Sequence, residues 1–483
     1  MNTKTARWVL VLSSLASLMV ALDALVVSTA LSAIRHSLGT SIEELSWTVN
    51  AYGLSFAVLL VPAAALGDRL GRRRLFAAGL GLFVLGSVAC AVSPSAGLLI
   101  AARALQGSAA ALVAPLSLAL VSTAFPPERR GWAMGVYGGI TGLAVLSGAV
   151  VGGAVTQGLA WQWVFWINVP IGLAVIPLVL RHIPESYGPR ARLDVPGLGL
   201  VAVAALGVVW GLMRGNESGW DSVEVVGSLV AGVAALVAFV LVERRVRAPM
   251  LPPRMFARRG FSAGIASSFL FSAALFSAVF FMAQFQQVSL GQGPLDAGLR
   301  LLPWTGTVFI VAPIAGALTN RVGERALVTL GLAMQAAGMA WIALIAQPGM
   351  TYWHMITPMV IAGAGAAMAI PPAQNVVMSA VAPADMGKAS GAYMTMRQLG
   401  AVFGLAITVA VFTGAGSYGS AQAFGDGFVP ALALAAALSL AAALVAALLP
   451  RHTPQMEVSA RVASSLDPRQ PVTVPALSEA GNS

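Results

Sequence analysis

Charged side chains are scarce in this sequence. They make up 10% of its 483 residues, whereas an ordinary soluble domain carries roughly 25%. Hydrophobic residues make up 58%, and the mean hydropathy is +0.83. A soluble protein of this length needs far more charge to cover its surface, so most of this surface must face something other than water.

Common signals of cofactor chemistry are missing as well. A single cysteine, Cys90, excludes a disulfide framework or a thiol metal site, and the four histidines are scattered along the chain. There is no G-x-x-x-x-G-K-[ST] segment, which excludes ATP hydrolysis by this chain. The basic residues form short clusters between apolar runs rather than a stripe, so the net charge of +10 does not indicate nucleic acid. We therefore predict no cofactor, no metal site and no nucleic-acid partner.

The sequence consists largely of long apolar segments. A spanning helix needs about 20 largely apolar residues, and the sequence predicts fourteen such spans in an all-α integral membrane protein. They lie near residues 8–31, 47–66, 75–93, 98–121, 132–155, 163–180, 196–213, 223–242, 262–283, 296–318, 326–346, 354–373, 390–413 and 428–449. The first span is too long for a signal peptide and carries Asp23, so we expect it to be retained.

The positions of lysine and arginine predict the orientation of these spans. With the N-terminus inside, most of the 28 basic residues fall on the cytoplasmic side, and only Arg35, Arg214 and Arg300 fall at the other face. Both termini are then cytoplasmic. The basic loop at 244–260 is a plausible junction between a first bundle and a second. The polar segment 451–483 is expected to be a disordered cytoplasmic tail.

Three charged residues lie inside predicted spans, where a charge costs at least about 2.5–3.5 kcal/mol. They are Asp23, Arg103 and Arg397. At about 1.5 Å per residue, Asp23 and Arg103 lie about 12 and 10 Å below the same outer face, so they could meet. A carboxylate that alternately pairs with an arginine and takes up a proton would couple proton flow to conformational change. The alternative is a static ion pair that holds two helices together. Arg397 could attract anionic substrate groups or bond backbone carbonyls.

Several motifs resemble those of a known family. Residues 66–74 read LGDRLGRRR, which is similar to the G-x-L-a-D-R-x-G-r-r signature of the major facilitator superfamily, with Ala64 at the first glycine. Residues 103–111 read RALQGSAAA and resemble the motif that carries the membrane arginine linked to proton transfer. Residues 148–153 read GAVVGG and look like the antiporter motif G-P-x-x-G-G, with Ala149 in place of proline.

Three further segments resemble the fourteen-helix drug:proton antiporter branch of that superfamily. They are LDALVV at 22–27, WQWVFWINVPIG at 161–172 and RQLG at 397–400. The resemblance implies an N-terminal six-helix bundle (1–192), two inserted helices (193–243), the loop at 244–260 and a C-terminal six-helix bundle (261–450). It also implies a substrate cavity between the bundles that opens alternately to each side.

The resemblance assigns roles to residues of this chain. Asp23 is the first candidate for the proton site, with Arg103 modulating it. Four residues would form the cytoplasmic gate: Asp68, Arg69, Gly71 and Arg72. Glycines of the antiporter motif would pack helices closely: Gly148, Gly152 and Gly153. Polar residues that either line the cavity or pack between helices are Asn50, Tyr52, Gln284, Gln374 and Arg397.

The resemblance therefore implies proton-coupled export of amphipathic drugs or antibiotics across a bacterial cytoplasmic membrane, by a protein that works as a monomer. One alternative is a proton-coupled importer or facilitator of a small metabolite on the same scaffold. Another is a membrane-embedded lipid or prenyl transferase. Such an enzyme needs clustered carboxylates for a metal-diphosphate, and the only adjacent acidic pair, Glu43-Glu44, falls in an outer loop. We therefore expect no catalytic residues.

Overall fold

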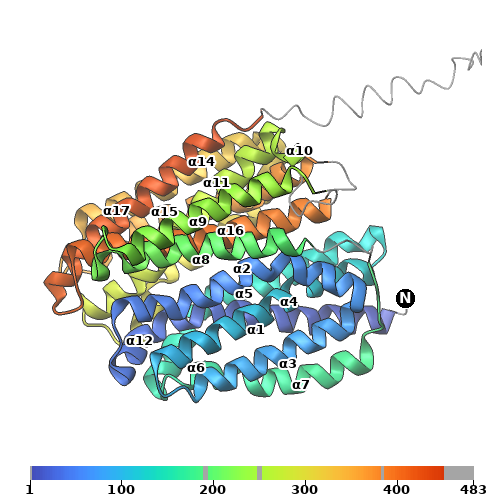
Figure 1. The fold of residues 1–483 in the computed structure, drawn as a ribbon, viewed down its shortest axis with the longest axis horizontal. Coiled ribbons are helices and arrows are strands. Elements are labelled where there is room, and N and C mark those ends of the chain that lie inside the picture. Colours follow the sequence, from blue (N-terminus) through green and yellow to red (C-terminus); the bar gives the residue numbers. More distant parts are fainter. Residues whose placement is uncertain (1–2, 189–193, 247–252, 382–385, 451–483) are drawn as a thin grey trace, which may run out of the picture.

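The apolar segments form helices because a helix hydrogen-bonds its own backbone where no water is available. The computed structural model describes residues 3–188, 194–246, 253–381 and 386–450. Every regular element in these ranges is an α-helix (Figure 1). The predicted tail at 451–483 lies outside the described residues.

The first group of helices covers residues 3 to 182. It consists of α1 (Thr3–Leu38), α2 (Ile42–Leu70), α3 (Arg72–Ala91), α4 (Ala96–Ala124), α5 (Pro127–Gly158), α6 (Trp163–Trp166) and α7 (Asn168–His182). Two long helices follow, α8 (Val195–Ser218) and α9 (Val223–Glu243). The second group consists of α10 (Pro253–Phe256), α11 (Arg259–Val288), α12 (Pro294–Arg300), α13 (Leu302–Val322), α14 (Glu324–Ile345), α15 (Trp353–Ser379), α16 (Met386–Ala415) and α17 (Ala421–Ala446).

Twelve segments of the described chain are long and apolar enough to cross a membrane. The two arms of α2, which meet at 52° between Leu60 and Pro62, make a thirteenth if they count as one span. Pro62 lacks the backbone N–H of a regular helix, and this accounts for the bend. The all-helical membrane architecture is thus confirmed, whereas the number of fourteen spans stays a prediction.

The two ends of the molecule differ in charge. The basic end carries Arg69 and Arg72, where α2 meets α3, and the opposite end is called the distal end. Trp8, near the start of α1, stacks on His182 at the end of α7, with ring centroids 4.4 Å apart. His182 closely precedes Glu185, which contacts the α2–α3 junction. The N-terminal part of α1 therefore lies at the basic end, and its side of the membrane stays a prediction.

Helix contacts separate the two groups and join them at a few places. Helices α1–α7 pack mainly on one another, and α11 and α13–α17 do the same, whereas the short helix α12 packs mainly on α5. Helix α8 packs on α9, α16 and α2, so the α8–α9 pair lies beside the second group (Figure 1). The groups meet where α5 contacts α12, α1 contacts α11 and α2 contacts α16. The domain boundaries given above stay a prediction.

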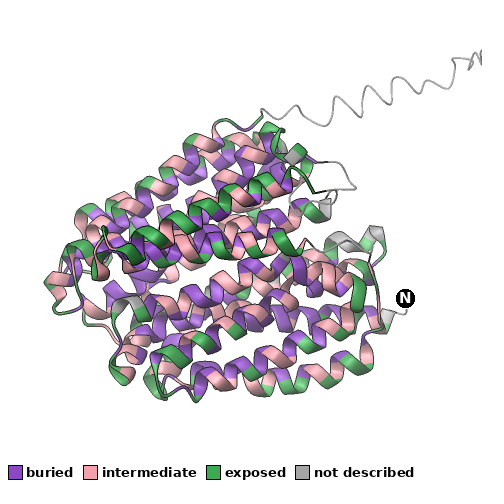
Figure 2. Ribbon diagram, viewed as in Figure 1, coloured by how far each residue is buried: buried purple, intermediate pink, exposed green. Residues whose placement is uncertain are grey.

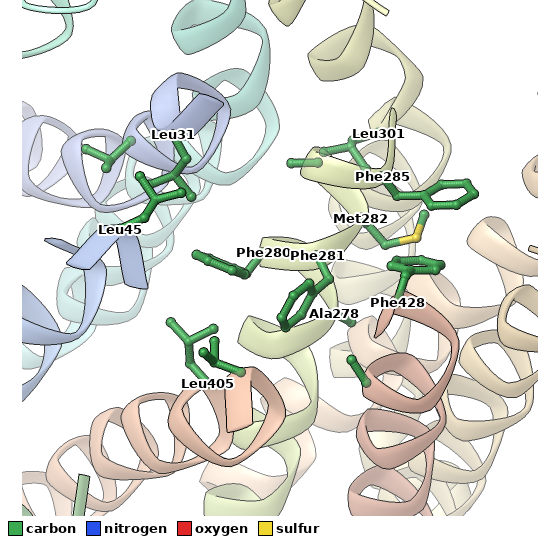
Figure 3. Close-up of a cluster of buried hydrophobic side chains, with 14 of the residues drawn as sticks. Leu31, Leu45, Ala278, Phe280, Phe281, Met282, Phe285, Leu301, Leu405 and Phe428 are labelled. Carbon is green, nitrogen blue, oxygen red and sulfur yellow. The ribbon is translucent and has the colours of Figure 1, made fainter. Parts of the chain in front are cut away.

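The largest buried apolar cluster joins the two groups. It brings Leu31 and Leu45 of the first group together with Phe280, Phe281 and Leu405 of the second (Figure 3). The outside of the molecule is also rich in apolar side chains: Leu344, for example, is 87% exposed. Figure 2 shows exposed residues along the outer faces of many helices. An apolar exterior of this kind suits lipid, as the low charge of the sequence predicts.

Candidate functional site

Asp23 of α1 and Arg103 of α4 form an ion pair inside the first group of helices. Nη1 of Arg103 lies 2.6 Å from Oδ2 of Asp23, and both residues are 1% exposed. The depths estimated from the sequence placed the two side chains at a similar level, and the structure brings them into contact. Two charges this deep exist only because each neutralises the other.

Neutral donors complete the surroundings of the carboxylate. Nε2 of Gln106 donates to Oδ1 of Asp23 at 2.9 Å, and Nδ2 of Asn168 donates to the same oxygen at 2.8 Å. Both amides also donate to Oγ of Ser87, at 2.8 and 3.3 Å. Asp23 therefore accepts three hydrogen bonds, from two helices of its own group. A carboxylate with three donors is arranged as an ionised group.

The guanidinium of Arg103 has its own set of partners. It donates from Nη1 to Oε1 of Gln106 at 2.7 Å and from Nε to the carbonyl of Thr48 at 3.1 Å. The ring of Tyr52 lies 4.3 Å from the guanidinium carbon and the ring of Phe165 lies 5.8 Å from it. Aromatic faces stabilise a desolvated cation. Arg103 thereby ties α1, α2 and α4 together at one point.

Two glycines allow the helices around this site to approach closely. A Cβ at Gly107 of α4 would lie 2.2 Å from the carbonyl oxygen of Tyr52 in α2. A Cβ at Gly86 of α3 would lie 3.1 Å from Cα of Gln106 in α4. Small residues of this kind let membrane helices pack at short distance. Larger side chains here would push Arg103 and Gln106 away from their partners.

Gln106, Asn168 and Ser87 were not among the site residues predicted from the sequence. Gln106 and Asn168 stand inside the two motifs quoted above, at 103–111 and 161–172, so a sequence signal for them existed. Ser87 lies in an apolar stretch of α3 and carries no such signal. Nothing in the sequence indicates that Asn168, which is 145 residues from Asp23, contacts that carboxylate.

A small cavity lies beside Arg103, between α1, α2, α11 and α16. Its volume is about 50 Å³, and Asn50 and Tyr52 are among its lining residues, as is Gln398 of α16. A drug-sized ligand needs several hundred cubic ångströms, so this space suits a few water molecules. Helices α2 and α16 of the two groups are in contact beside this cavity.

Three other residues predicted for the cavity lie elsewhere. Gln284 is buried, donates to the carbonyl of Phe280 at 3.1 Å and accepts a hydrogen bond from the hydroxyl of Tyr418. Gln374 is exposed on α15. Arg397 donates from Nε to Oγ of Ser272 at 3.4 Å. None of the three lines the cavity beside Arg103. Gln284 lies one turn beyond the lining residue Phe280, and α15, which carries Gln374, contributes no residue to the lining. A role in substrate contact stays a prediction for them.

Tyr418, in the turn between α16 and α17, belongs to a contact between the two groups at the distal end. The guanidinium carbon of Arg35, in α1, lies 4.6 Å from the centre of its ring. Burial raises the pKa of the Tyr418 phenol above its usual range, so its hydroxyl stays protonated and donates to Gln284. Ser32 of α1 also donates to Gln287 of α11 nearby. These contacts hold the groups together at the distal end.

The antiporter-motif glycines lie at helix contacts. A Cβ at Gly148 would lie 2.8 Å from Cβ of Leu25, and one at Gly152 would lie 2.7 Å from the carbonyl oxygen of Val26. Both neighbours belong to α1. A Cβ at Gly153 would lie 2.3 Å from the carbonyl oxygen of Pro294, in α12 of the other group. The contact at Gly153 therefore exists only while the two groups are close at the distal end.

The predicted gate residues form a compact loop at the basic end. Oδ1 of Asp68 accepts hydrogen bonds from Arg72, with distances of 2.8 Å to Nε and 2.7 Å to Nη2. Gly71 has a φ of +108°, which permits the tight turn between α2 and α3. Arg69 is exposed. The sequence analysis missed Glu185, whose carboxylate accepts from the backbone N–H of Arg73 at 2.9 Å.

Metal chemistry has no support in the described part of the chain. No group of three or more His, Cys, Asp or Glu side chains there could hold a metal ion. The site consists of a buried carboxylate, Asp23, paired with a buried guanidinium, Arg103. A small cavity lies beside it, and the glycine contact between the two groups lies at the distal end.

Comparisons with known proteins identify relatives along nearly the whole chain. A sequence model of the Major Facilitator Superfamily matches residues 13–405. The cephamycin export protein of Amycolatopsis lactamdurans is 35% identical over 439 residues, which cover 89% of this chain and 90% of that protein. The puromycin resistance protein of Streptomyces alboniger is 35% identical, with 84% of this chain and 82% of that protein covered. A tetracenomycin C resistance and export protein of Streptomyces glaucescens is 33% identical, covering 81% and 73%.

Solved structures show the same fold at low sequence identity. A bacterial homologue of the human lysosomal transporter Spinster, in an inward-facing and occupied conformation, gives a TM-score of 0.68 at 15% identity. The match covers 94% of this chain and all of that one. A peptide transporter in complex with sulfate gives a TM-score of 0.66 at 15% identity, covering 92% and 96%. These likenesses concern the arrangement of helices alone.

Proposed function

This chain belongs to the major facilitator superfamily, and we propose that it exports antibiotics or other amphipathic drugs in exchange for protons. It is a multi-pass protein of the plasma membrane and a transporter rather than an enzyme. The direction of transport is supported by its relatives, which are an exporter of cephamycin, an exporter of tetracenomycin C and a puromycin resistance protein. Proton entry from the bacterial exterior would supply the energy.

Asp23 is the proposed proton carrier, and the observation that supports this most is its set of three donors. As found, both carboxylate oxygens accept hydrogen bonds, from Arg103, Gln106 and Asn168. A proton on this carboxylate removes its negative charge and weakens the ion pair with Arg103. We propose that protonation thereby loosens the present packing of α1 against α4.

Movement of Arg103 would also displace α2, which forms part of the cavity wall. The Nε of Arg103 is bound to the carbonyl of Thr48 in α2. The same helix contributes Asn50 and Tyr52 to the cavity and contacts α16 on the other side. When Asp23 takes up a proton and releases Arg103, α2 loses an anchor. We propose that proton uptake occurs while the site is open to the exterior, and that the loss of this anchor lets the two groups return to the state that opens toward the cytoplasm, where the proton is released and a drug binds.

The contacts at the distal end close the cavity toward one side of the membrane. In this structure Gly153 lies against α12, and the ring of Tyr418 lies beside Arg35. With the basic end on the cytoplasmic side, this is a state closed to the exterior. Opening of these contacts would expose Asp23 and the drug site to the outside, where the drug leaves and a proton binds. A single chain provides all of these parts, so the proposal needs no second subunit.

The experiment uses inverted membrane vesicles that contain the full-length protein and are acidified inside. A fluorescent dye or an antibiotic should accumulate in the vesicles against its own gradient. It should fail to do so with Asp23→Asn. Asp426→Asn serves as the matched control, since Asp426 is an exposed carboxylate far from the site. Accumulation by Asp23→Asn at the control rate would refute proton coupling through Asp23.

A further inference from the structure

A groove of about 860 Å³ lies on the outside of the first group, where α8 approaches α2 and α4. It is far larger than the small cavity beside Arg103 and falls in the size range of drug-binding sites. Its residues span α2 from Glu44 to Leu59, which is about 22 Å at 1.5 Å per residue. Helix α8 closes the other side of the groove with Ala202, Leu206 and Trp210.

The two ends of the groove differ in chemistry. Its deeper part is apolar, with Leu54, Val58 and Leu206 among its lining residues. Its distal end is polar and aromatic. There the rings of Trp47 and Trp210 lie 5.7 Å apart at an angle of 50°. A ligand that fits both ends must therefore be amphipathic.

The charges at the distal end favour a cation. Glu44, Glu217 and Arg214 line the groove there, and Glu224 stands beside it through a hydrogen bond from Trp210 at 2.9 Å. Three carboxylates and one guanidinium thus lie at this end of the groove. That guanidinium is already paired, at 2.5 Å with Glu217 and 3.3 Å with Glu224. An anionic headgroup would meet net negative charge at this end of the groove, whereas a cation would be attracted by it.

The tryptophans add to this preference, because aromatic faces attract organic cations. The cavity beside Arg103 differs: its lining, among the residues that the structure describes, includes no carboxylate. Asp23 is hydrogen-bonded to Arg103, Gln106 and Asn168 instead. Helix α2 separates the two spaces, with Trp47 and Ala51 on the groove side and Asn50 and Tyr52 on the cavity side.

We propose that this groove is a second binding site, open to the bilayer, for amphipathic organic cations. The cationic end lies between the carboxylates of Glu44 and Glu217 and the rings of Trp47 and Trp210. The apolar body lies along Leu206. This proposal rests on the proposed export function in one respect: the cations that bind the groove would be among the substrates that the protein exports. Binding to the groove itself needs no transport.

The test measures equilibrium binding of radiolabelled tetraphenylphosphonium to the full-length protein in phosphatidylcholine nanodiscs, with empty nanodiscs subtracted. The double variant Glu44→Gln/Glu217→Gln removes both carboxylates, and glutamine at 44 keeps the helix cap that Glu44 forms with Ser41. We expect affinity to fall about tenfold, as two partly exposed charge contacts are lost. Asp426→Asn, at an exposed acid of the second group, should bind like wild type.

Two further measurements separate charge from folding. Ala202→Trp fills the groove without changing charge, and it should also weaken binding of tetraphenylphosphonium. Triphenylphosphine oxide, a neutral probe with similar aryl groups, should bind equally to the wild type and the double glutamine variant. Unchanged tetraphenylphosphonium binding in the double variant, or in Ala202→Trp, overturns the proposal.

Lipid is the competing occupant. If native mass spectrometry finds a phospholipid that Ala202→Trp loses but tetraphenylphosphonium does not displace, the groove is a lipid site and the proposal is wrong. Asp23→Asn distinguishes this proposal from the export mechanism. That variant should bind tetraphenylphosphonium in the groove as the wild type does, even where transport is abolished.

Discussion

Removing one charge of the Asp23–Arg103 pair should cost far more than removing both. Asp23→Asn leaves the Arg103 guanidinium buried without a counter-ion, and Arg103→Leu leaves the carboxylate with only Gln106 and Asn168. Both residues are 1% exposed, so solvent cannot compensate. Breaking a buried pair by removing one partner costs about 3–5 kcal/mol, whereas replacing the whole pair by neutral groups is often close to neutral.

The double variant Asp23→Asn/Arg103→Leu tests this arithmetic. The two single variants should lose about 6–10 kcal/mol in sum, and the double variant should lose much less than that sum. The coupling energy is therefore several kcal/mol. It can be measured by denaturant unfolding of the purified protein in mixed micelles, followed by far-UV circular dichroism.

Transport by the same three variants separates a proton site from a static ion pair. If Asp23 carries the proton, the double variant should recover stability but not accumulate drug against its gradient in acidified inverted vesicles. A static pair predicts that stability and transport return together. Recovery of both in the double variant would refute the proton-carrier role, and a coupling energy near zero would refute the reasoning on burial.

Other contacts give further predictions. Asn168→Ala removes a donor from the ionised carboxylate and should cost about 1.5–3 kcal/mol of stability, seen in the same unfolding assay, together with most of the transport. Gly153→Ala would place Cβ 2.3 Å from a carbonyl oxygen of α12. It should cost the distally closed state about 1–3 kcal/mol, seen as a longer spin-label distance between α5 and α12. Gly138→Ala, with open space around it, should leave that distance unchanged. Asp68→Asn loses its bonds to Arg72 at the partly exposed basic end. Unfolding should shift by less than about 1 kcal/mol while the rate of drug accumulation falls, and an unchanged rate would exclude the gate role.

The sequence predicted the membrane architecture well, because composition and the length of apolar runs decide it. It predicted less about where helices break. The span expected at 163–180 is divided at Ile167 into α6 and α7, and the one at 296–318 begins with the separate helix α12. Pro303 stands at the start of α13, where its missing N–H is tolerated. Both segments still pass as single apolar spans when averaged over a window, so hydropathy does not reveal these breaks.

The candidate site was predicted in part. Rise along a helix fixes depth, and depth was enough to pair Asp23 with Arg103. For Gln284, Gln374 and Arg397 a role in substrate contact stays a prediction, because depth alone does not say which helices and side chains surround a residue. Membrane helices gain little from hiding apolar faces from an equally apolar lipid. The apolar pattern therefore carries little information on which face of a helix is buried.

By itself, the sequence determined that the chain crosses a membrane many times. It also determined that a few charges lie at costly depths and that family motifs stand in order along nearly the whole length. Only the tertiary structure decided that Asn168 donates a hydrogen bond to the carboxylate of Asp23. It also decided that Gly153 lies at a contact between the two groups and that α8 and α2 line a groove. The physical reason is that composition and helical rise act along one chain segment. Partners from distant segments are selected by close packing in three dimensions.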